Sequence, residues 1–228
     1  MGTSKGYIAP KTPYWSQAKR AVTSFENNRD HASKINAARK YASAMKKDMA
    51  SEDSFQSAVV GVLGFAQKVA SNGLDRALRE YNREDLIGKS SDVIWTELLH
   101  DFTNAGATVE DNLAADALSQ ALENLNIDDI SKIGDITVDT LLKEMLKEYI
   151  KIYFDFCYEE KILKGRSPAQ ALDIIKDMHE YIDNSIDGDL DLSKLKTINF
   201  SDMGASKVVK EALYDAFSVF EKYYEEEE

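Results

Sequence analysis

The residue with the most distinctive chemistry is Gly2, which follows the first methionine. We expect Met1 to be removed, because methionine is normally cleaved before glycine, so that the mature chain begins at Gly2. An α-amino group has a pKa of about 7.7–8.0, so a useful fraction is neutral and nucleophilic at cellular pH. Glycine has no Cβ and can enter a narrow site. The neighbouring Thr3, Ser4 and Lys5 add hydrogen-bond donors. This segment is therefore the candidate for modification or partner binding.

An acidic stretch at residues 183–194 partly follows the pattern of a calcium-binding loop. Asp183 stands at the first ligand position and Gly188 at the position of the sharp turn. Lys194, however, occupies the twelfth position, where the pattern needs a bidentate carboxylate. We interpret the stretch as an ordinary acidic loop and predict no metal site.

The remaining reactive side chains form no catalytic pattern. Cys157, the single cysteine, excludes an internal disulfide and is expected to be a small core residue. His31, His100 and His179 have no spacing typical of metal ligands or a catalytic pair, and the chain contains no phosphate-binding or nucleophile-elbow motif. The sequence therefore predicts a protein that is not an enzyme and that carries no cofactor.

The charge of the chain is unevenly distributed. The net charge is −12, but residues 1–50 hold ten basic and three acidic side chains, a net of +7. The other 178 residues hold 18 basic and 37 acidic side chains, a net of −19. The acidic total argues against a general binder of nucleic acids or anionic membranes. The basic segment 19–47 keeps phosphate contacts open as an alternative.

The elements that position these groups begin with a tail. Residues 1–14 contain two of the three prolines and predict an extended N-terminal tail. Tyr14 and Trp15 are its first large apolar side chains after Pro13 and are expected to anchor the tail. A first helix is predicted from Ser16, as N-cap, to Glu26.

Helical periodicity dominates the rest of the chain, and we predict an all-α fold of about nine or ten helices in a single compact domain over residues 15–224. Residues 225–228 form an acidic end. Gly61 and Gly64 are expected to allow another helix to approach closely. After the first helix, the predicted helices are 31–49, 51–71, 74–81, 84–87, 91–103, 110–125, 137–164, 167–185 and 205–224, with the helix 137–164 at the centre of the core. No apolar run approaches the ~20 residues of a membrane span, so we expect a soluble cytoplasmic protein.

The N-terminal segment resembles the start of a known family. Met-Gly-Thr-Ser at residues 1–4, followed by Pro10, Pro13 and Trp15, is similar to the start of QatB, a component of the bacterial Qat anti-phage defence system. The resemblance covers about fifteen residues.

This resemblance implies a partner enzyme, the QatC-like relative of the QueC class of deazaguanine synthases. QueC enzymes use ATP to activate a carboxylated 7-deazaguanine, which ammonia then attacks. In the QatC-like branch a protein N-terminal glycine amine is thought to replace ammonia. On this chain Gly2 would be the acceptor, with Thr3, Ser4 and Lys5 as its recognised neighbours. The same systems include an ATPase and a TatD-like nuclease, either of which could bind the helical body.

Two further hypotheses remain open. The chain could be a helical adaptor or immunity protein whose tail is incidental. It could also be a nucleic-acid-binding module that uses the basic segment 19–47.

Overall fold

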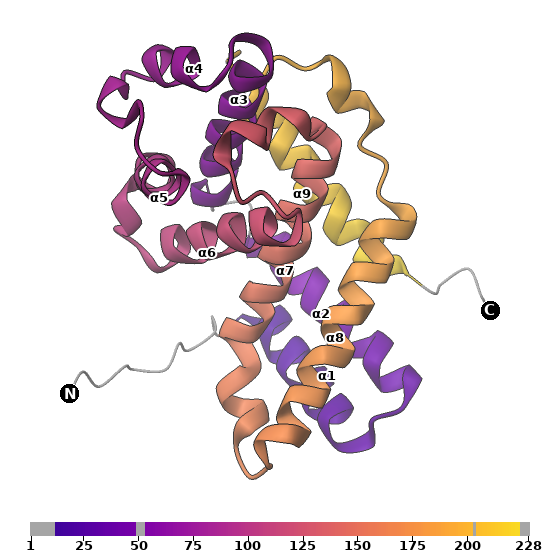
Figure 1. Cartoon of the computed structure of the whole chain (residues 1–228). Helices are drawn as coiled ribbons and strands as arrows, with labels where there is room; N and C mark the ends of the chain where they lie inside the picture. Colours follow the sequence, from indigo (N-terminus) through magenta and orange to yellow (C-terminus); the bar gives the residue numbers. More distant parts are fainter. Residues whose placement is uncertain (1–11, 49–52, 203, 224–228) are drawn as a thin grey trace. The chain divides into compact units, whose positions relative to one another are not determined.

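The computed structural model describes residues 12–48, 53–202 and 204–223, and these form an all-α protein (Figure 1). Nine α-helices and four short 3₁₀-helices, with no strand, make up these described ranges. The predicted fold class is confirmed. The α-helices are α1 (Pro13–Asn28), α2 (His31–Asp48), α3 (Ser54–Asn72), α4 (Leu74–Glu80), α5 (Ser91–Phe102), α6 (Val109–Asn124), α7 (Val138–Leu163), α8 (Pro168–Asp189) and α9 (Ala205–Lys222). The 3₁₀-helices are η1 (Glu84–Leu86), η2 (Asn104–Gly106), η3 (Ile130–Asp135) and η4 (Ser193–Thr197).

Local sequence signals set the helix ends. α8 begins as predicted, with Pro168 in its first turn and the Ser167 side chain accepting a hydrogen bond from the Gln170 amide. The Gln170 side chain accepts in return from the Ser167 amide, which completes a capping box. Gly73 ends α3 at a φ of 77°, and its N–H bonds the Val69 carbonyl.

Within the described residues, the chain divides into two compact units. The first contains α1, α2, the C-terminal part of α7 from Ile150, α8 and the end of α9. The second contains the helices from α3 to the start of α7, together with η4 and the start of α9. No helix of the described residues has the length and apolar character needed to cross a bilayer. The single domain proposed for residues 15–224 stays a prediction.

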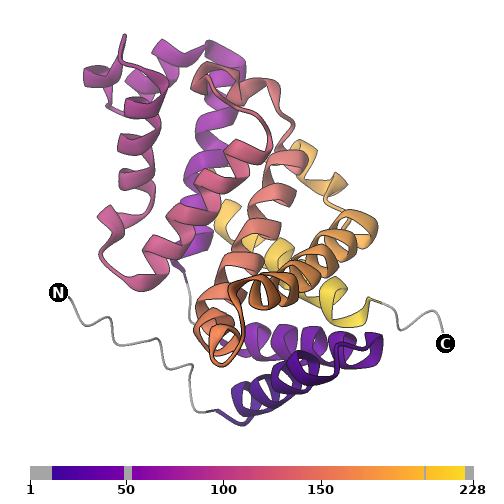
Figure 2. The same cartoon turned by 60° about the horizontal axis from the view of Figure 1, so that its bottom comes forward.

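In the first unit α1 and α2 lie side by side (Figures 1 and 2), and their core is built on an aromatic cluster. The buried Tyr41 ring meets Phe154, Phe217 and Phe220 edge-on, with ring centroids 5.4, 6.5 and 6.1 Å away. The Tyr41 hydroxyl donates to the Ile150 carbonyl at 2.9 Å. The buried hydroxyl therefore has its partner, and the cluster joins helices distant in sequence.

In the second unit α3 is the helix on which several segments pack closely. A Cβ added at Gly61 would lie 2.6 Å from the Phe102 ring of α5, and one at Gly64 would lie 2.9 Å from the Tyr81 hydroxyl. The predicted close approach of another helix is thus found at Gly61, whereas the close neighbour of Gly64 is a tyrosine that follows α4. Burial raises the pKa of Tyr81 to about 12.

The segment Thr197–Phe200 begins at the last residue of η4 and is not a strand. Two of its backbone polar groups bond one side chain of α3. The Gln67 amide donates to the Ile198 carbonyl at 2.7 Å, and the Gln67 carbonyl accepts from the Phe200 amide at 2.9 Å. The Gln67 side chain therefore supplies hydrogen bonds to this backbone that a neighbouring strand would supply in a sheet.

α7 carries much of the core, as expected for the helix predicted at its centre. Leu141, Leu142 and Met145 are buried in its first half. Further along, Phe154, Tyr158 and Ile162 are buried at an i, i+4 spacing, so one face of the helix stays in the core.

Candidate functional site

The described chain begins at Thr12, and α1 starts three residues earlier than predicted. Thr12 is the N-cap, with its hydroxyl accepting from the Trp15 amide at 3.4 Å, and Pro13 occupies the first turn. Proline suits this position because the first N–H groups of a helix have no partner within it. The expectation that Ser16 caps this helix is therefore wrong.

Trp15 fixes the start of α1 to the first unit. Its side chain is 2% exposed, and the indole N–H donates to the carboxylate of Asp48, the last residue of α2. The indole also stacks on the Tyr153 ring at 6.3 Å and meets Tyr41 at a tilt. Trp15 therefore combines apolar packing with a hydrogen bond to its indole N–H, and it anchors the start of α1.

Tyr14, the other predicted anchor residue, has a different environment. Its side chain is 42% exposed, and the Lys47 ammonium lies 5.5 Å from its ring centroid. Of the two residues, only Trp15 contributes to the core. Gly2, Thr3, Ser4 and Lys5, the predicted modification and partner-binding residues, lie outside the described residues.

The basic segment 19–47 is partly neutralised within the first unit. Arg29 pairs with Asp173 and Asp177 of α8 at 2.6 and 2.7 Å. Lys46 pairs with Glu221 of α9 at 2.6 Å and lies over the Tyr214 ring. These two cations are engaged with acidic partners of the same unit, which reduces the charge available for phosphate contacts.

The acidic stretch 183–194 differs from its prediction as a loop. α8 continues to Asp189, so more than half of the stretch is helical. Asp183 pairs with Lys151 at 2.6 Å. Across the described ranges, no group of three or more potential ligands is placed to hold a metal ion.

The cysteine and the three histidines lie on different helices. Cys157, on α7, forms no disulfide and is half-buried, so the expectation of a core residue is only partly met. His179, on α8, shares a hydrogen bond with Asp155 at 2.9 Å, with both side chains just over a quarter exposed. His31 lies on α2 and His100 on α5.

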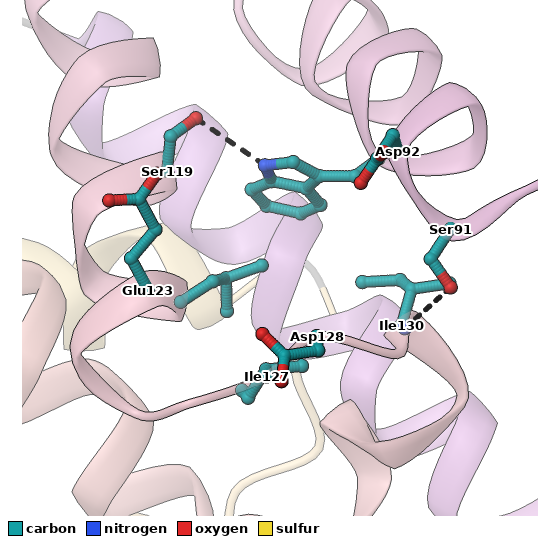
Figure 3. A pocket seen from close by; sticks show the side chains of 9 residues that line it. Ser91, Asp92, Ser119, Glu123, Ile127, Asp128 and Ile130 are labelled. Atoms are coloured by element: carbon teal, nitrogen blue, oxygen red, sulfur yellow. Dashed lines mark hydrogen bonds between the residues drawn. The ribbon is translucent and has the colours of Figure 1, made fainter.

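A pocket of about 430 Å³ opens in the second unit between α5, α6 and the segment 127–130 (Figure 3). The indole of Trp95 forms part of it, and its N–H donates to the Ser119 hydroxyl at 3.4 Å. Three carboxylates line it, from Asp92, Glu123 and Asp128. Sequence analysis missed this site, because its residues come from three separate segments without a shared spacing.

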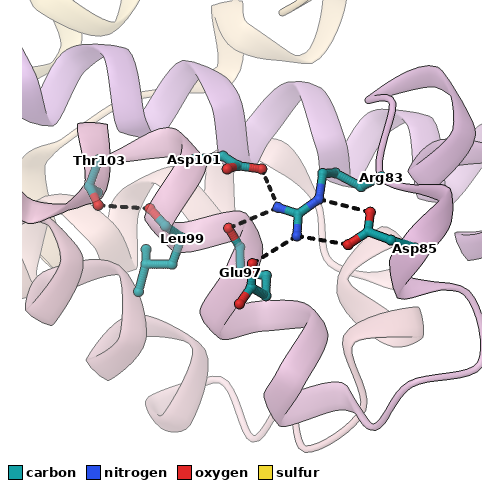
Figure 4. A network of polar contacts seen from close by, with 6 residues as sticks. All are labelled: Arg83, Asp85, Glu97, Leu99, Asp101 and Thr103. Atoms are coloured by element: carbon teal, nitrogen blue, oxygen red, sulfur yellow. Dashed lines mark hydrogen bonds and ion pairs between the residues drawn. The ribbon is translucent and has the colours of Figure 1, made fainter.

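A second polar cluster in this unit is centred on Arg83 (Figure 4). The guanidinium bonds the carboxylates of Asp85 and Glu97 at 3.1 and 2.8 Å, and that of Asp101. Hydrogen bonds to Asp85, Asp101 and Glu97 raise the pKa of Arg83 further above its already high value. The Arg83 donors are therefore occupied by carboxylates. Because Asp85 belongs to η1 and the other two to α5, the cluster holds these two elements together.

Comparison with known proteins identifies the helical body. Searches of curated proteins and of solved structures gave no match. A protein-family model described as "Qat anti-phage system associated protein QatB" matches residues 42–220. The match covers more than half of the chain and excludes the N-terminal segment that carried the resemblance, so the two are independent. The chain belongs to the QatB family, whose members are components of the Qat anti-phage defence system.

Proposed function

We propose that this defence-system component is a non-enzymatic protein whose N-terminal tail is bound and modified by a QueC-like partner enzyme. Gly2 is the acceptor, and Thr3, Ser4 and Lys5 are the neighbours that the partner recognises. The single observation that carries the proposal is the anchoring of Trp15, which fixes the chain to the first unit thirteen residues after Gly2.

The proposed step is the formation of an amide. ATP activates the carboxylate of a carboxylated 7-deazaguanine. The neutral Gly2 amine then attacks the carboxyl carbon, and the C–O bond to the activating group breaks as the C–N bond forms. The leaving group departs with its oxygen and the bonding electrons, and the nitrogen loses its extra proton to water. The conjugate keeps the whole protein chain and loses one carboxylate oxygen from the deazaguanine.

The geometry of the anchor supports this step. A chain extends at most ~3.3–3.6 Å per residue, so the ten residues 2–11 can place Gly2 up to ~35 Å from Thr12. The anchor itself stays in place, because the Trp15 indole is held by Asp48 and by stacking on Tyr153.

Deletion of residues 2–9 tests the tail against the adaptor hypothesis. We expect the shortened chain to fold, since Thr12 and Trp15 remain, but to lose both co-purification of the QueC-like enzyme and phage protection. Deletion of residues 225–228 serves as the matched control and should leave both intact. If the chain lacking residues 2–9 keeps both properties, the tail is incidental and the adaptor hypothesis is correct.

A further inference from the structure

We propose that the Trp95 pocket, defined here by Trp95, Ser119, Asp92, Glu123 and Asp128, receives an arginine side chain from a partner protein. The pocket lies entirely within the second unit, and the proposal does not rest on the modification of Gly2.

The lining of the Trp95 pocket is acidic. Asp92, Glu123 and Asp128 are all exposed, and Figure 3 shows them on different sides of the pocket. None of the nine described residues that line the pocket is basic. Glu123 accepts a hydrogen bond from Gln120 at 3.3 Å. The side chains of Asp92 and Asp128 make no hydrogen bond or ion pair with any residue in the described ranges. The pocket is therefore complementary to a cation and repels an anion.

One wall of the pocket is aromatic and is formed by Trp95. The Trp95 indole is half-buried, and its N–H bond to Ser119 fixes the orientation of the ring. Tryptophan is the strongest aromatic partner for a cation. A planar guanidinium can stack on such a ring and still direct its N–H groups at surrounding carboxylates, which a compact ammonium cannot do equally well.

The pocket is held by hydrogen bonds and is large enough for one long side chain. The Ser91 hydroxyl accepts from the Ile130 amide at 3.2 Å and donates to Asp129 at 3.3 Å, which ties the start of α5 to the segment that closes the pocket. A volume of about 430 Å³ falls in the range of sites that hold small ligands, and it is ample for one long side chain. Within the described ranges no three carboxylates, histidines or cysteines, including those of this pocket, are placed to hold a metal ion together.

The indole N–H signals provide the test. The full-length chain contains two tryptophans, so the ¹⁵N spectrum has two indole signals, which the variant Trp95→Phe assigns. The probe is the peptide acetyl-Gly-Arg-Gly-amide, compared with the same peptide carrying neutral citrulline. We expect the Trp95 signal to shift in a saturable manner as the arginine peptide is added. The dissociation constant of the citrulline peptide should be at least tenfold higher, and binding of the arginine peptide should weaken at high salt. The buried Trp15 signal is the internal control and should not move.

Matched variants assign the effect to the pocket carboxylates. The double variant Asp92→Asn and Asp128→Asn should weaken peptide binding at least tenfold. The control variant Asp75→Asn and Glu84→Gln removes the same charge from exposed positions outside the pocket and should change binding less than twofold. Absence of a Trp95 shift, an equal response to citrulline, or an equal loss in the control variant would overturn the proposal. Spermidine that binds as tightly as the arginine peptide would overturn the assignment to an arginine side chain.

Discussion

At the residue scale, two neighbouring aromatic side chains have opposite environments. Trp15 is buried, whereas Tyr14 is largely exposed. The sequence predicted both as large apolar anchors but did not distinguish them, because the predicted helix began at Ser16 and left both residues outside it. With the start at Pro13, the helical repeat places Trp15 on the same buried face as Ala18 and Val22.

Replacement of Trp15 by alanine should therefore destabilise the protein far more than replacement of Tyr14. We expect Trp15→Ala to lower the free energy of unfolding by about 3–5 kcal/mol, since it leaves a cavity and removes the indole N–H bond to Asp48. Tyr14→Ala should cost less than about 1 kcal/mol. Urea unfolding followed by circular dichroism measures both, and equal losses would show that Trp15 is not the anchor.

A titrating residue at the start of α6 should add a pH dependence. Burial raises the pKa of Asp111, but hydrogen bonding to the carboxylate, including the bond from the Thr108 amide at 3.0 Å, outweighs this and lowers the pKa below 3.8. Stability from the ionised carboxylate is thus present above the unfolded pKa of about 3.9 and is lost as the pH falls through the folded value.

Asp111→Asn should be less stable than the wild type at pH 7, and the difference should shrink as the pH falls from 5 towards 2. Asp116→Asn, at an exposed position of the same helix, is the control and should follow the wild-type curve. Thermal melts across this pH range test the prediction. A gap between Asp111→Asn and the wild type that stays constant with pH would refute it.

At the scale of the elements, most helix positions could be predicted and one acidic loop could not. The stretch after Asp183 is rich in Asp and contains Gly188, a composition typical of loops. The structure continues α8 through it, because Ile182, Ile186 and Leu190 keep the i, i+4 spacing and are all buried. Burial of a continuing apolar stripe outweighs the local preference.

Close packing between elements predicts different effects for two glycines. A Cβ at Gly134 of η3 would lie 2.5 Å from the Ala70 backbone nitrogen of α3, and backbone cannot move aside cheaply. We expect Gly134→Ala to destabilise the protein by about 1–3 kcal/mol. Gly188→Ala, in α8 with no atom within 4 Å of the new Cβ, should be neutral or stabilising by up to about 1 kcal/mol. Chemical denaturation measures the free energy of unfolding of both variants. An unchanged value for Gly134→Ala would show that η3 does not pack closely on α3 at this position.

At the scale of the whole molecule, the charge contrast of +7 and −19 is only partly available to partners. Arg29 and Lys46 are paired with acids of their own unit, which the sequence could not show because those acids lie more than 140 residues further along the chain. The Trp95 pocket escaped prediction because its residues come from three segments without a shared spacing. The family match, in contrast, depends on the helical body alone.

We therefore expect the full chain to pass unretained through a nucleic-acid column at physiological salt, because its net charge is −12 and part of its basic segment is paired. Retention that is lost in the variant Lys40→Glu and Lys47→Glu would instead support the nucleic-acid hypothesis. The control for that outcome is Lys176→Glu and Lys207→Glu, which reverses two exposed charges outside the basic segment.

Mass spectrometry of the protein co-expressed with its QueC-like partner decides whether Gly2 is the acceptor of an amide-linked deazaguanine. We expect loss of Met1 and an added mass equal to the carboxylated deazaguanine minus water, located by fragmentation on the Gly2 nitrogen. Protein expressed without the partner should lack this mass, as should a chain carrying a blocking extension before Gly2. An unmodified N-terminus after co-expression, or the same mass found on another residue, would show that Gly2 is not the acceptor.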